Sequence, residues 1–336
     1  MNFTTSSTTE DVPGERPAQA QTTSGGRASI GIVIPTYNRQ NHLLECLRHL
    51  ERQTCKDFVV SIIDDGSTDS TCESIANYQL TASFPLRYDR QTNRGQAVGR
   101  NRAIAQLETP LCILIGDDIF PAPDFVRVHL ELHREHPELE VVGLGLTLWS
   151  EEGQVVTPFM RWAGWDGVQF IYAGLMDGEA PSWKHFYTSN LSFKTAYLRQ
   201  NPFHEGFRRY GMEDIELGYR LAAEHGLRMY FVRNAVASHL HPTTFRGICR
   251  RMLDAGEGAY LFEQLWPERR PPAFGAVKGL LFRVLTERHV MLPLLAWIGD
   301  LSLRFRCPNP LIKRVLFLHE LAGRKRAAAR ALAQGD

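Results

Sequence analysis

Two adjacent carboxylates follow a short apolar run, and their position suggests metal chemistry. The run at 111–115 (LCILI) is followed by Gly116, Asp117 and Asp118. Neighbouring carboxylates repel each other, so a bound cation would remove an electrostatic cost. Mg²⁺ or Mn²⁺ prefers hard oxygen ligands and commonly uses one or two carboxylates together with phosphate oxygens of a substrate. A capped turn entering the loop at 121–123 is the alternative interpretation.

A second acidic pair, Asp64 and Asp65, follows the apolar run at 58–63 (FVVSII). The sequence has no GxGxxG after its first apolar run and no GxxxxGK[ST], so neither a dinucleotide fingerprint nor a P-loop is supported. A nucleotide could instead be held by carboxylates that accept hydrogen bonds from its base or ribose. The same residues could cap the helix that follows, and the two roles are compatible.

A third group, Glu213 and Asp214, lies at the start of a predicted helix over 213–225. A fixed carboxylate there could take the proton from a sugar hydroxyl, as a general base does. Simple stabilisation of acidic side chains by the helix dipole explains the pair equally well. His239 and His241 follow a short apolar run. A histidine at the end of a strand can give a metal its nitrogen ligand, although a lone histidine is more often structural.

The elements that must position these groups alternate between short apolar runs and amphipathic segments. Such alternation is typical of right-handed βαβ units and predicts an α/β fold with a mainly parallel sheet. In these sheets ligands bind beyond the carboxyl ends of the strands, where the acidic pairs fall. The predicted strands are 29–34, 58–63, 86–90, 111–115, 141–148, 189–193, 228–231 and 235–238, and the helices between them are 40–52, 70–78, 96–107, 124–136 and 213–225.

Five blocks in a fixed order connect the chain to a known family. They are VIPTYNR (33–39), DDGSTD (64–69), NRGQAVGRNRAI (93–104), GDD (116–118) and YGMEDIELGYRL (210–221). Together they resemble the family 2 glycosyltransferases over about residues 29–242. The resemblance implies the GT-A fold, a Rossmann-like sheet flanked by helices. It also implies an inverting transfer from a nucleotide-diphosphate sugar, commonly UDP-linked, assisted by Mg²⁺ or Mn²⁺.

The same resemblance assigns residues to the donor site. Pro35, Thr36 and Arg39 would line the nucleotide pocket, with Asp65 reaching the base and Asp64 beside it.

The resemblance also assigns the metal site. Asp117 would lie against the ribose and the sugar, and Asp118 would bind the metal that bridges the diphosphate. The GMEDIEL stretch is similar to galactosyl- and N-acetylgalactosaminyl-transferases, in which a downstream histidine completes the metal site. His239 is the first candidate for that histidine and His241 the second. The aspartates are adjacent here instead of spaced as DxD, which leaves the division of roles between them open.

By resemblance Asp214 would be the catalytic base and Glu213 would orient the acceptor. The expected function is transfer of a hexosyl or N-acetylhexosaminyl group to a hydroxyl of a glycan or lipid-linked acceptor, as in cell-surface polysaccharide or glycoconjugate synthesis. A non-catalytic module that binds a nucleotide sugar or glycan is the alternative, but such a module needs no base. A nucleotidyltransferase would want a basic glycine-rich loop after the first strand, which 33–39 lacks.

Composition argues against a nucleic-acid-binding or disordered protein, and the charge differs between two parts of the chain. The 336 residues carry 38 Lys+Arg and 37 Asp+Glu, a net charge of +1, which disfavours a nucleic-acid partner. The 43% hydrophobic content disfavours disorder. Residues 1–245 hold 22 basic and 29 acidic side chains, whereas 246–336 hold 16 and 8. We therefore expect a disordered leader at 1–28, a catalytic domain at 29–244 and a basic, helical C-terminal extension at 245–336.

Two further features bear on compartment and acceptor. The six cysteines have no CxxC spacing, which favours reduced thiols and a cytoplasmic protein. The segment 149–186 is rich in Trp, Gly and Phe. It could bind an acceptor by stacking on sugar faces, or it could form a second small aromatic core.

The helices of the C-terminal extension could contact either a membrane or the catalytic domain. Apolar spacing predicts helices at 275–285 and 311–321, with basic flanks that could dock on an anionic membrane at the inner face of the plasma membrane. A helical cap on the catalytic domain is the alternative. The longest uncharged apolar run, 290–299, is too short to cross ~30 Å of hydrocarbon. The basic residues concerned are Lys278, Arg283, Arg304, Arg306, Lys313, Arg314, Arg324, Lys325 and Arg326.

Overall fold

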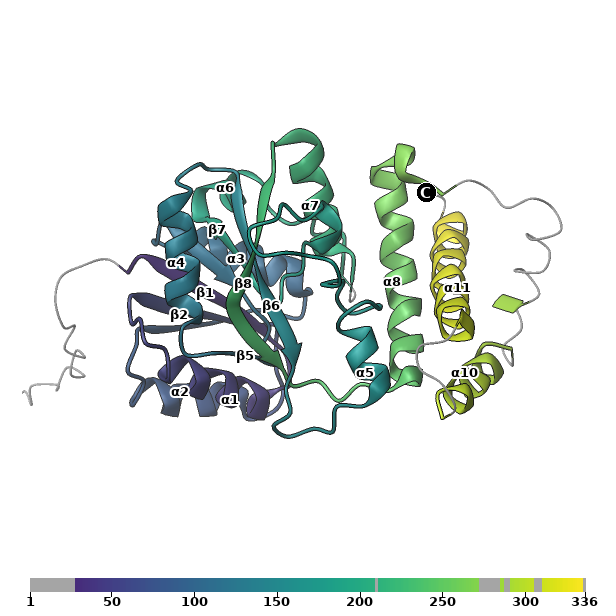
Figure 1. Ribbon diagram of the computed structural model, residues 1–336, viewed down its shortest axis with the longest axis horizontal. Coiled ribbons are helices and arrows are strands. Elements are labelled where there is room, and N and C mark those ends of the chain that lie inside the picture. Colours follow the sequence, from purple (N-terminus) through teal and green to yellow (C-terminus); the bar gives the residue numbers. More distant parts are fainter. Residues whose placement is uncertain (1–27, 209–210, 272–284, 287–290, 305–309, 335–336) are drawn as a thin grey trace, which may run out of the picture.

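The computed structural model describes residues 28–208, 211–271, 285–286, 291–304 and 310–334. Within them, an eight-stranded sheet carries helices on both faces, and the C-terminal helices stand to one side (Figure 1). The predicted leader lies outside the described residues except for residue 28. The helix predicted at 275–285 lies outside them except for its last residue.

The sheet has the strand order β3-β2-β1-β4-β7-β6-β8-β5. Strands β3, β2, β1 and β4 are parallel neighbours, and β6 and β8 are also parallel. Strand β7 is antiparallel to both β4 and β6, and β5 is antiparallel to β8. The predicted α/β fold with a mainly parallel sheet is confirmed. The strands are β1 (Ile30–Thr36), β2 (Phe58–Asp64), β3 (Leu86–Arg90), β4 (Leu111–Leu114), β5 (Ile119–Pro121), β6 (Val141–Trp149), β7 (Leu191–Lys194) and β8 (Arg228–His239).

Two apolar cores lie on the two faces of this sheet. On one face, α1, α2 and α4 cover side chains such as Ile32 and Val60, and on the other, α3, α6 and α7 cover side chains such as Val33 and Leu144. Each helix buries a stripe at three- and four-residue spacing, as an amphipathic helix on a sheet does. The helices are α1 (Gln40–Glu51), α2 (Thr71–Gln79), α3 (Gln96–Gln106), α4 (Phe125–Glu135), α5 (Pro158–Ala163), α6 (Thr195–Gln200) and α7 (Glu213–Glu224).

Two strand predictions need correction. Strand β1 continues through Pro35 to Thr36, whereas the sequence suggested that it stops at the proline. The carbonyl of Val33 accepts a hydrogen bond from Ile115, so the missing N–H of Pro35, two residues on, points to the side where β4 has ended. The predicted strands 228–231 and 235–238 form one strand, β8. Its pairing with β6 shifts register between Gly145 and Leu146, as at a β-bulge.

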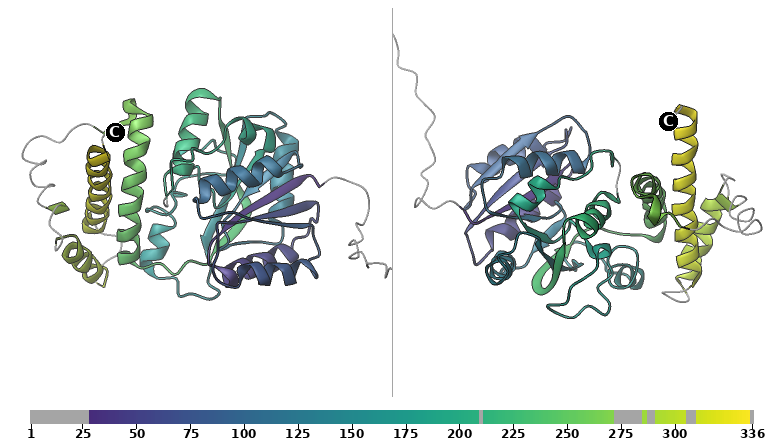
Figure 2. Two further views of the ribbon diagram at one scale, coloured as in Figure 1. Left: turned by 180° about the vertical axis from the view of Figure 1, so that it is seen from behind. Right: turned by 90° about the horizontal axis from the view of Figure 1, so that it is seen from above.

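The C-terminal region consists of α8 (Phe245–Leu265), α10 (Met291–Ser302) and α11 (Pro310–Gln334). Helices α8 and α11 lie side by side in both views of Figure 2. They approach closely because a Cβ atom at Gly256 would come within 2.0 Å of the Glu320 carbonyl oxygen, and one at Gly323 within 2.0 Å of that of Leu253. Only glycine allows this crossing.

The C-terminal helices also pack on the part of the chain that forms the sheet and its covering helices. Phe159 and Trp162 of α5 share an apolar cluster with Phe245 of α8 and Val315 of α11. The stripe of α11 that we considered for membrane docking is therefore covered by protein. Among the described helices, none is both long and apolar enough to cross a bilayer.

Candidate active site

A cavity of about 700 Å³ opens at the carboxyl ends of β1 and β4 and is walled on the other side by α7 and α8. Nine of the ten residues predicted for the site line it, and the exception is Asp64. The nine are Pro35, Thr36, Arg39, Asp65, Asp117, Asp118, Glu213, Asp214 and His239. Segments as far apart in the sequence as those of Pro35 and His239 thus meet in one place.

One wall of the cavity carries a carboxylate with two imidazoles. The Asp118 Oδ2 atom lies 3.2 Å from His239 Nε2 and 3.3 Å from His241 Nδ1. All three side chains offer potential metal ligands within 4.8 Å of one another. Burial alone would raise the pKa of Asp118, but the two histidines and Arg39 outweigh it and hold that pKa well below its usual range. Trp149 stacks on His239 with ring centroids 5.1 Å apart and so fixes the imidazole.

The adjacent Asp117 faces different partners. Thr36 Oγ1 donates to Asp117 Oδ2 over 2.8 Å, and Arg39 Nε lies 3.4 Å from Asp117 Oδ1. The same guanidinium donates through Nη2 to Asp118 Oδ2 over 2.9 Å. Burial and the neighbouring Asp118 carboxylate raise the pKa of Asp117 to about 7. The two adjacent aspartates are therefore inequivalent, because only Asp118 also contacts the histidines.

The other acidic pair divides in the same way. Asp65 lines the cavity and accepts hydrogen bonds from the backbone N–H groups of Arg94 and Gly95, over 2.8 and 2.9 Å. Gly95 precedes α3 with φ +93°, a conformation that favours glycine. Asp64 is fully buried and accepts a 2.5 Å hydrogen bond from the Tyr88 hydroxyl. Asp64 thus orders the loop, and Asp65 is the carboxylate that a ligand in the cavity could reach.

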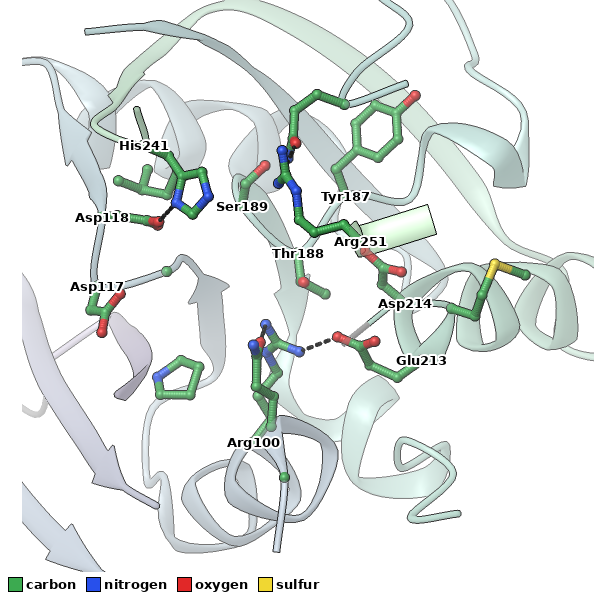
Figure 3. Close-up of a pocket in the computed structure, with 18 of the residues that line it drawn as sticks. Arg100, Asp117, Asp118, Tyr187, Thr188, Ser189, Glu213, Asp214, His241 and Arg251 are labelled. Atoms are coloured by element: carbon green, nitrogen blue, oxygen red, sulfur yellow. Dashed lines mark hydrogen bonds and ion pairs between the residues drawn. The ribbon is translucent and has the colours of Figure 1, made fainter. Parts of the chain in front are cut away.

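Glu213 and Asp214 face the Asp117, Asp118 and His241 wall across the cavity (Figure 3). Arg100 Nη1 donates to Glu213 Oε1 over 3.0 Å, and both side chains are buried. Burial, and then the Glu213 carboxylate, raise the pKa of Asp214 to about 7.

Helix α7 begins directly after a strained residue. Met212 has φ +76°, the left-handed region that non-glycine residues rarely adopt, and it also lines the cavity. Such strain persists only where the surrounding structure enforces it, and it gathers at functional sites. Here it fixes where Glu213 and Asp214 enter the cavity.

Several cavity residues were missed by the sequence interpretation. Arg100 lies within the NRGQAVGRNRAI block but received no role there. From α8, Arg251 donates to Gln169 Oε1 over 2.9 Å and helps to line the cavity. Its position depends on packing between distant segments, so no local signal could have found it. In the segment 149–186, Phe170 lines the cavity while Trp162 is buried in the cluster with α8, so the segment contributes to both the site and a core.

Comparison with known proteins places this geometry in a family. The sequence model described as glycosyl transferase family 2 matches residues 31–160, which include β1 to β6 and both aspartate pairs. Over these residues the chain is a family 2 glycosyltransferase.

Two curated relatives extend the match beyond residue 160. An uncharacterized glycosyltransferase of Bacillus subtilis, YfnE, is 28% identical over 265 residues, 65% of this chain and 66% of that protein. Validoxylamine A glucosyltransferase of Streptomyces hygroscopicus subsp. limoneus is 28% identical over 296 residues, 77% of this chain and 62% of that protein. This family 2 glycosyltransferase thus spans a little under two thirds of the length of these relatives.

Solved structures support the fold. A mannosyltransferase of Pyrobaculum calidifontis, in complex with GDP-Man and Mn²⁺, is 16% identical with a TM-score of 0.59, covering 90% of this chain and 88% of that one. TarS of S. aureus (residues 1–349), in complex with UDP, is 17% identical with a TM-score of 0.52, covering 92% of both chains. At these identities the likeness shows the GT-A fold of the family 2 glycosyltransferase and leaves its substrates open.

Proposed function

We propose that this glycosyltransferase transfers a hexosyl or N-acetylhexosaminyl group, with inversion, from a nucleotide-diphosphate sugar to a hydroxyl of a glycan or lipid-linked acceptor. The observation that carries the proposal is the pairing of two walls in one cavity. One wall presents Asp118 with His239 and His241, and the other presents Glu213 and Asp214. Inverting transfer needs a cation site for the leaving diphosphate on one side of the reacting carbon, and a base for the attacking hydroxyl on the other.

Asp118, His239 and His241 fit a divalent cation. The donor set, one carboxylate oxygen and two imidazole nitrogens, suits a cation that accepts both atom types, which favours Mn²⁺ over the oxygen-preferring Mg²⁺. Nδ1 of His239 is buried without a hydrogen-bond partner in the described part of the chain. Its Nε2 atom is the one that faces Asp118 and the proposed cation site. A cation held there supplies positive charge to the departing diphosphate.

Asp214 is proposed as the base. As the acceptor oxygen bonds to the anomeric carbon, the bond from that carbon to the diphosphate oxygen breaks, and the hydroxyl proton passes to the Asp214 carboxylate. Attack on the face opposite the leaving group inverts the configuration. A pKa of about 7 suits a base that works near neutral pH. Glu213, anchored by Arg100, would orient the acceptor hydroxyl.

The remaining predicted residues form the donor side. Asp65 and Asp117 line the cavity, where Asp65 would accept hydrogen bonds from a base and Asp117 from a ribose or sugar hydroxyl. Thr36 and Arg39 hold Asp117 in position. We also propose a cytoplasmic location, because the cysteines in the described ranges are free thiols, as a reducing compartment requires: Cys46, Cys55, Cys72, Cys112 and Cys249.

The experiment is a screen of UDP- and GDP-sugars for donor turnover by the purified protein, with and without Mn²⁺. We expect slow hydrolysis of one donor, dependent on the cation, because water can take the place of the acceptor. A donor that binds but is never turned over, with any cation and any acceptor glycan supplied, would instead identify a binding module.

A further inference from the structure

Helix α10 is apolar on two opposite faces, and only one of them is buried against other parts of the described chain. Leu292, Ala296 and Gly299 face inwards, and Gly299 contacts the Phe245 ring of α8. The opposite face carries a stripe at helical spacing i, i+3, i+4, i+7, whose members are 36% to 52% exposed: Leu294, Trp297, Ile298 and Leu301. We call these four residues the outer stripe. Folding alone does not explain them.

The outer stripe differs from other exposed apolar residues of the chain. Leu80 and Val155 are more exposed, but each stands alone, as scattered apolar residues commonly do. The stripe instead gathers four large side chains on two turns of one helix. Figure 1 shows α10 at the end of the molecule that is remote from the sheet, so the catalytic part does not cover the stripe.

The surroundings of α10 are basic. The helix forms one wall of a cavity of about 600 Å³, and the walls from α8 and α11 carry the exposed arginines Arg246, Arg250 and Arg326. The single acidic residue of α10, Asp300, lies 3.6 Å from the Arg246 guanidinium. Within the described ranges, Arg250 and Arg326 have no carboxylate partner. Positive charge therefore lies beside α10, around a cavity that its inward-facing Leu292 and Ala296 help to line.

We propose that α10 docks on an anionic lipid bilayer through the outer stripe. The stripe would enter the interface between headgroups and acyl chains, while Arg246, Arg250 and Arg326 attract the anionic headgroups. The twelve residues of α10 are too short to cross a bilayer, so the helix would lie in the interface. A second copy of this chain is a poorer occupant, because a two-fold contact would bring equivalent arginines toward one another.

This surface adjoins the active site through α8. Arg250 faces the cavity beside α10, and its neighbour Arg251 faces the active-site cavity. Docking would thus hold the active site close to a lipid surface, which suits a lipid-linked acceptor. Only the link to such an acceptor rests on the proposed function.

The test is flotation of the full chain with phosphatidylcholine vesicles, alone or with about one third phosphatidylglycerol. We expect binding to the anionic vesicles only, weakened about tenfold or more by Trp297→Ser with Leu301→Ser. Arg250→Gln with Arg326→Gln should weaken it about tenfold and reduce its dependence on salt. The matched control is Leu80→Ser, an exposed leucine of the catalytic part, which should bind as the wild type does.

Other results would overturn the proposal. Equal binding to neutral vesicles, or unchanged binding by the serine variant, would each do so. A wild-type dimer that the serine variant converts to monomer would show that a second copy covers the stripe instead. Donor turnover without vesicles should be the same in all variants, which verifies their folding and separates this test from that of the proposed function.

Discussion

The catalytic part and the C-terminal helices differ in whether their charged side chains are buried or exposed. In the catalytic part, Asp118 and Glu213 are buried, and each forms an ion pair with an arginine, Arg39 or Arg100. In the C-terminal part, Arg250 and Arg326 are exposed, and so are four apolar side chains of α10. Buried charge fixes geometry at a high desolvation cost, whereas exposed charge mainly attracts partners. The difference agrees with the proposed catalysis in one region and the proposed docking in the other.

Helix α8 joins the two regions. Its Arg251 lines the active-site cavity and its Arg250 the cavity beside α10, although the two are neighbours in sequence. The C-terminal helices therefore line part of the candidate active site as well as present a surface. Variants can show how far catalysis and surface docking depend on each other.

The largest effect is expected from Asp214→Asn. Loss of the base should lower turnover about a thousandfold while the donor still binds, because the donor side lies on the opposite wall. Steady-state rates with the best donor give the measurement. Glu224→Gln, an exposed change on the last turn of the same helix, should keep wild-type rates. Undiminished turnover in Asp214→Asn would remove this residue as the base.

Gly256→Ala should uncouple the two regions. The added methyl group would overlap the Glu320 carbonyl oxygen, so α8 and α11 must separate, at a cost of about 2 kcal/mol in the free energy of unfolding. Urea unfolding measures the loss, and turnover should fall with it because Arg251 moves. Gly247→Ala on the same helix meets only the Thr244 hydroxyl at 3.2 Å and should be neutral or slightly stabilising. Equal stability of the two variants would contradict the close crossing.

The smallest effect concerns pH. With the pKa of Asp214 raised to about 7, the base is protonated below that pH, so kcat/KM should fall as the pH drops through 7. Burial is the main cause and the Glu213 charge the next. In Glu213→Gln the remaining inflection should therefore move to lower pH, by about one unit. An inflection that stays in place would assign it to another group, such as Asp117.

Much of the catalytic part could be predicted because strand ends are visible in the sequence. Apolar runs that end in acidic pairs placed Asp65, Asp117 and Asp118 at one sheet edge. The sequence could not show that only Asp65 of the Asp64 and Asp65 pair reaches the cavity, because successive side chains along a strand point to opposite sides. That is why Asp64 was expected in the pocket but is held by Tyr88 instead.

The C-terminal part was less predictable because apolar spacing does not reveal what covers a stripe. The pattern at 311–321 favoured a membrane-facing helix slightly over a packed one, but Val315 is buried against α5 and α8. Helix α8 was missed altogether. The run at 290–299 showed only that it was too short to span a bilayer, and its division into a covered and an exposed face required the packing.

The central claim is that the metal side and the base side are separate walls of one cavity. Calorimetric titration with UDP and GDP, with and without Mn²⁺, tests it on the wild type, Asp118→Asn and Asp214→Asn. We predict that Mn²⁺ strengthens binding of one nucleotide at least about tenfold in the wild type and in Asp214→Asn, and has no such effect in Asp118→Asn. Retention of the Mn²⁺ effect in Asp118→Asn, or its loss in Asp214→Asn, would contradict the account.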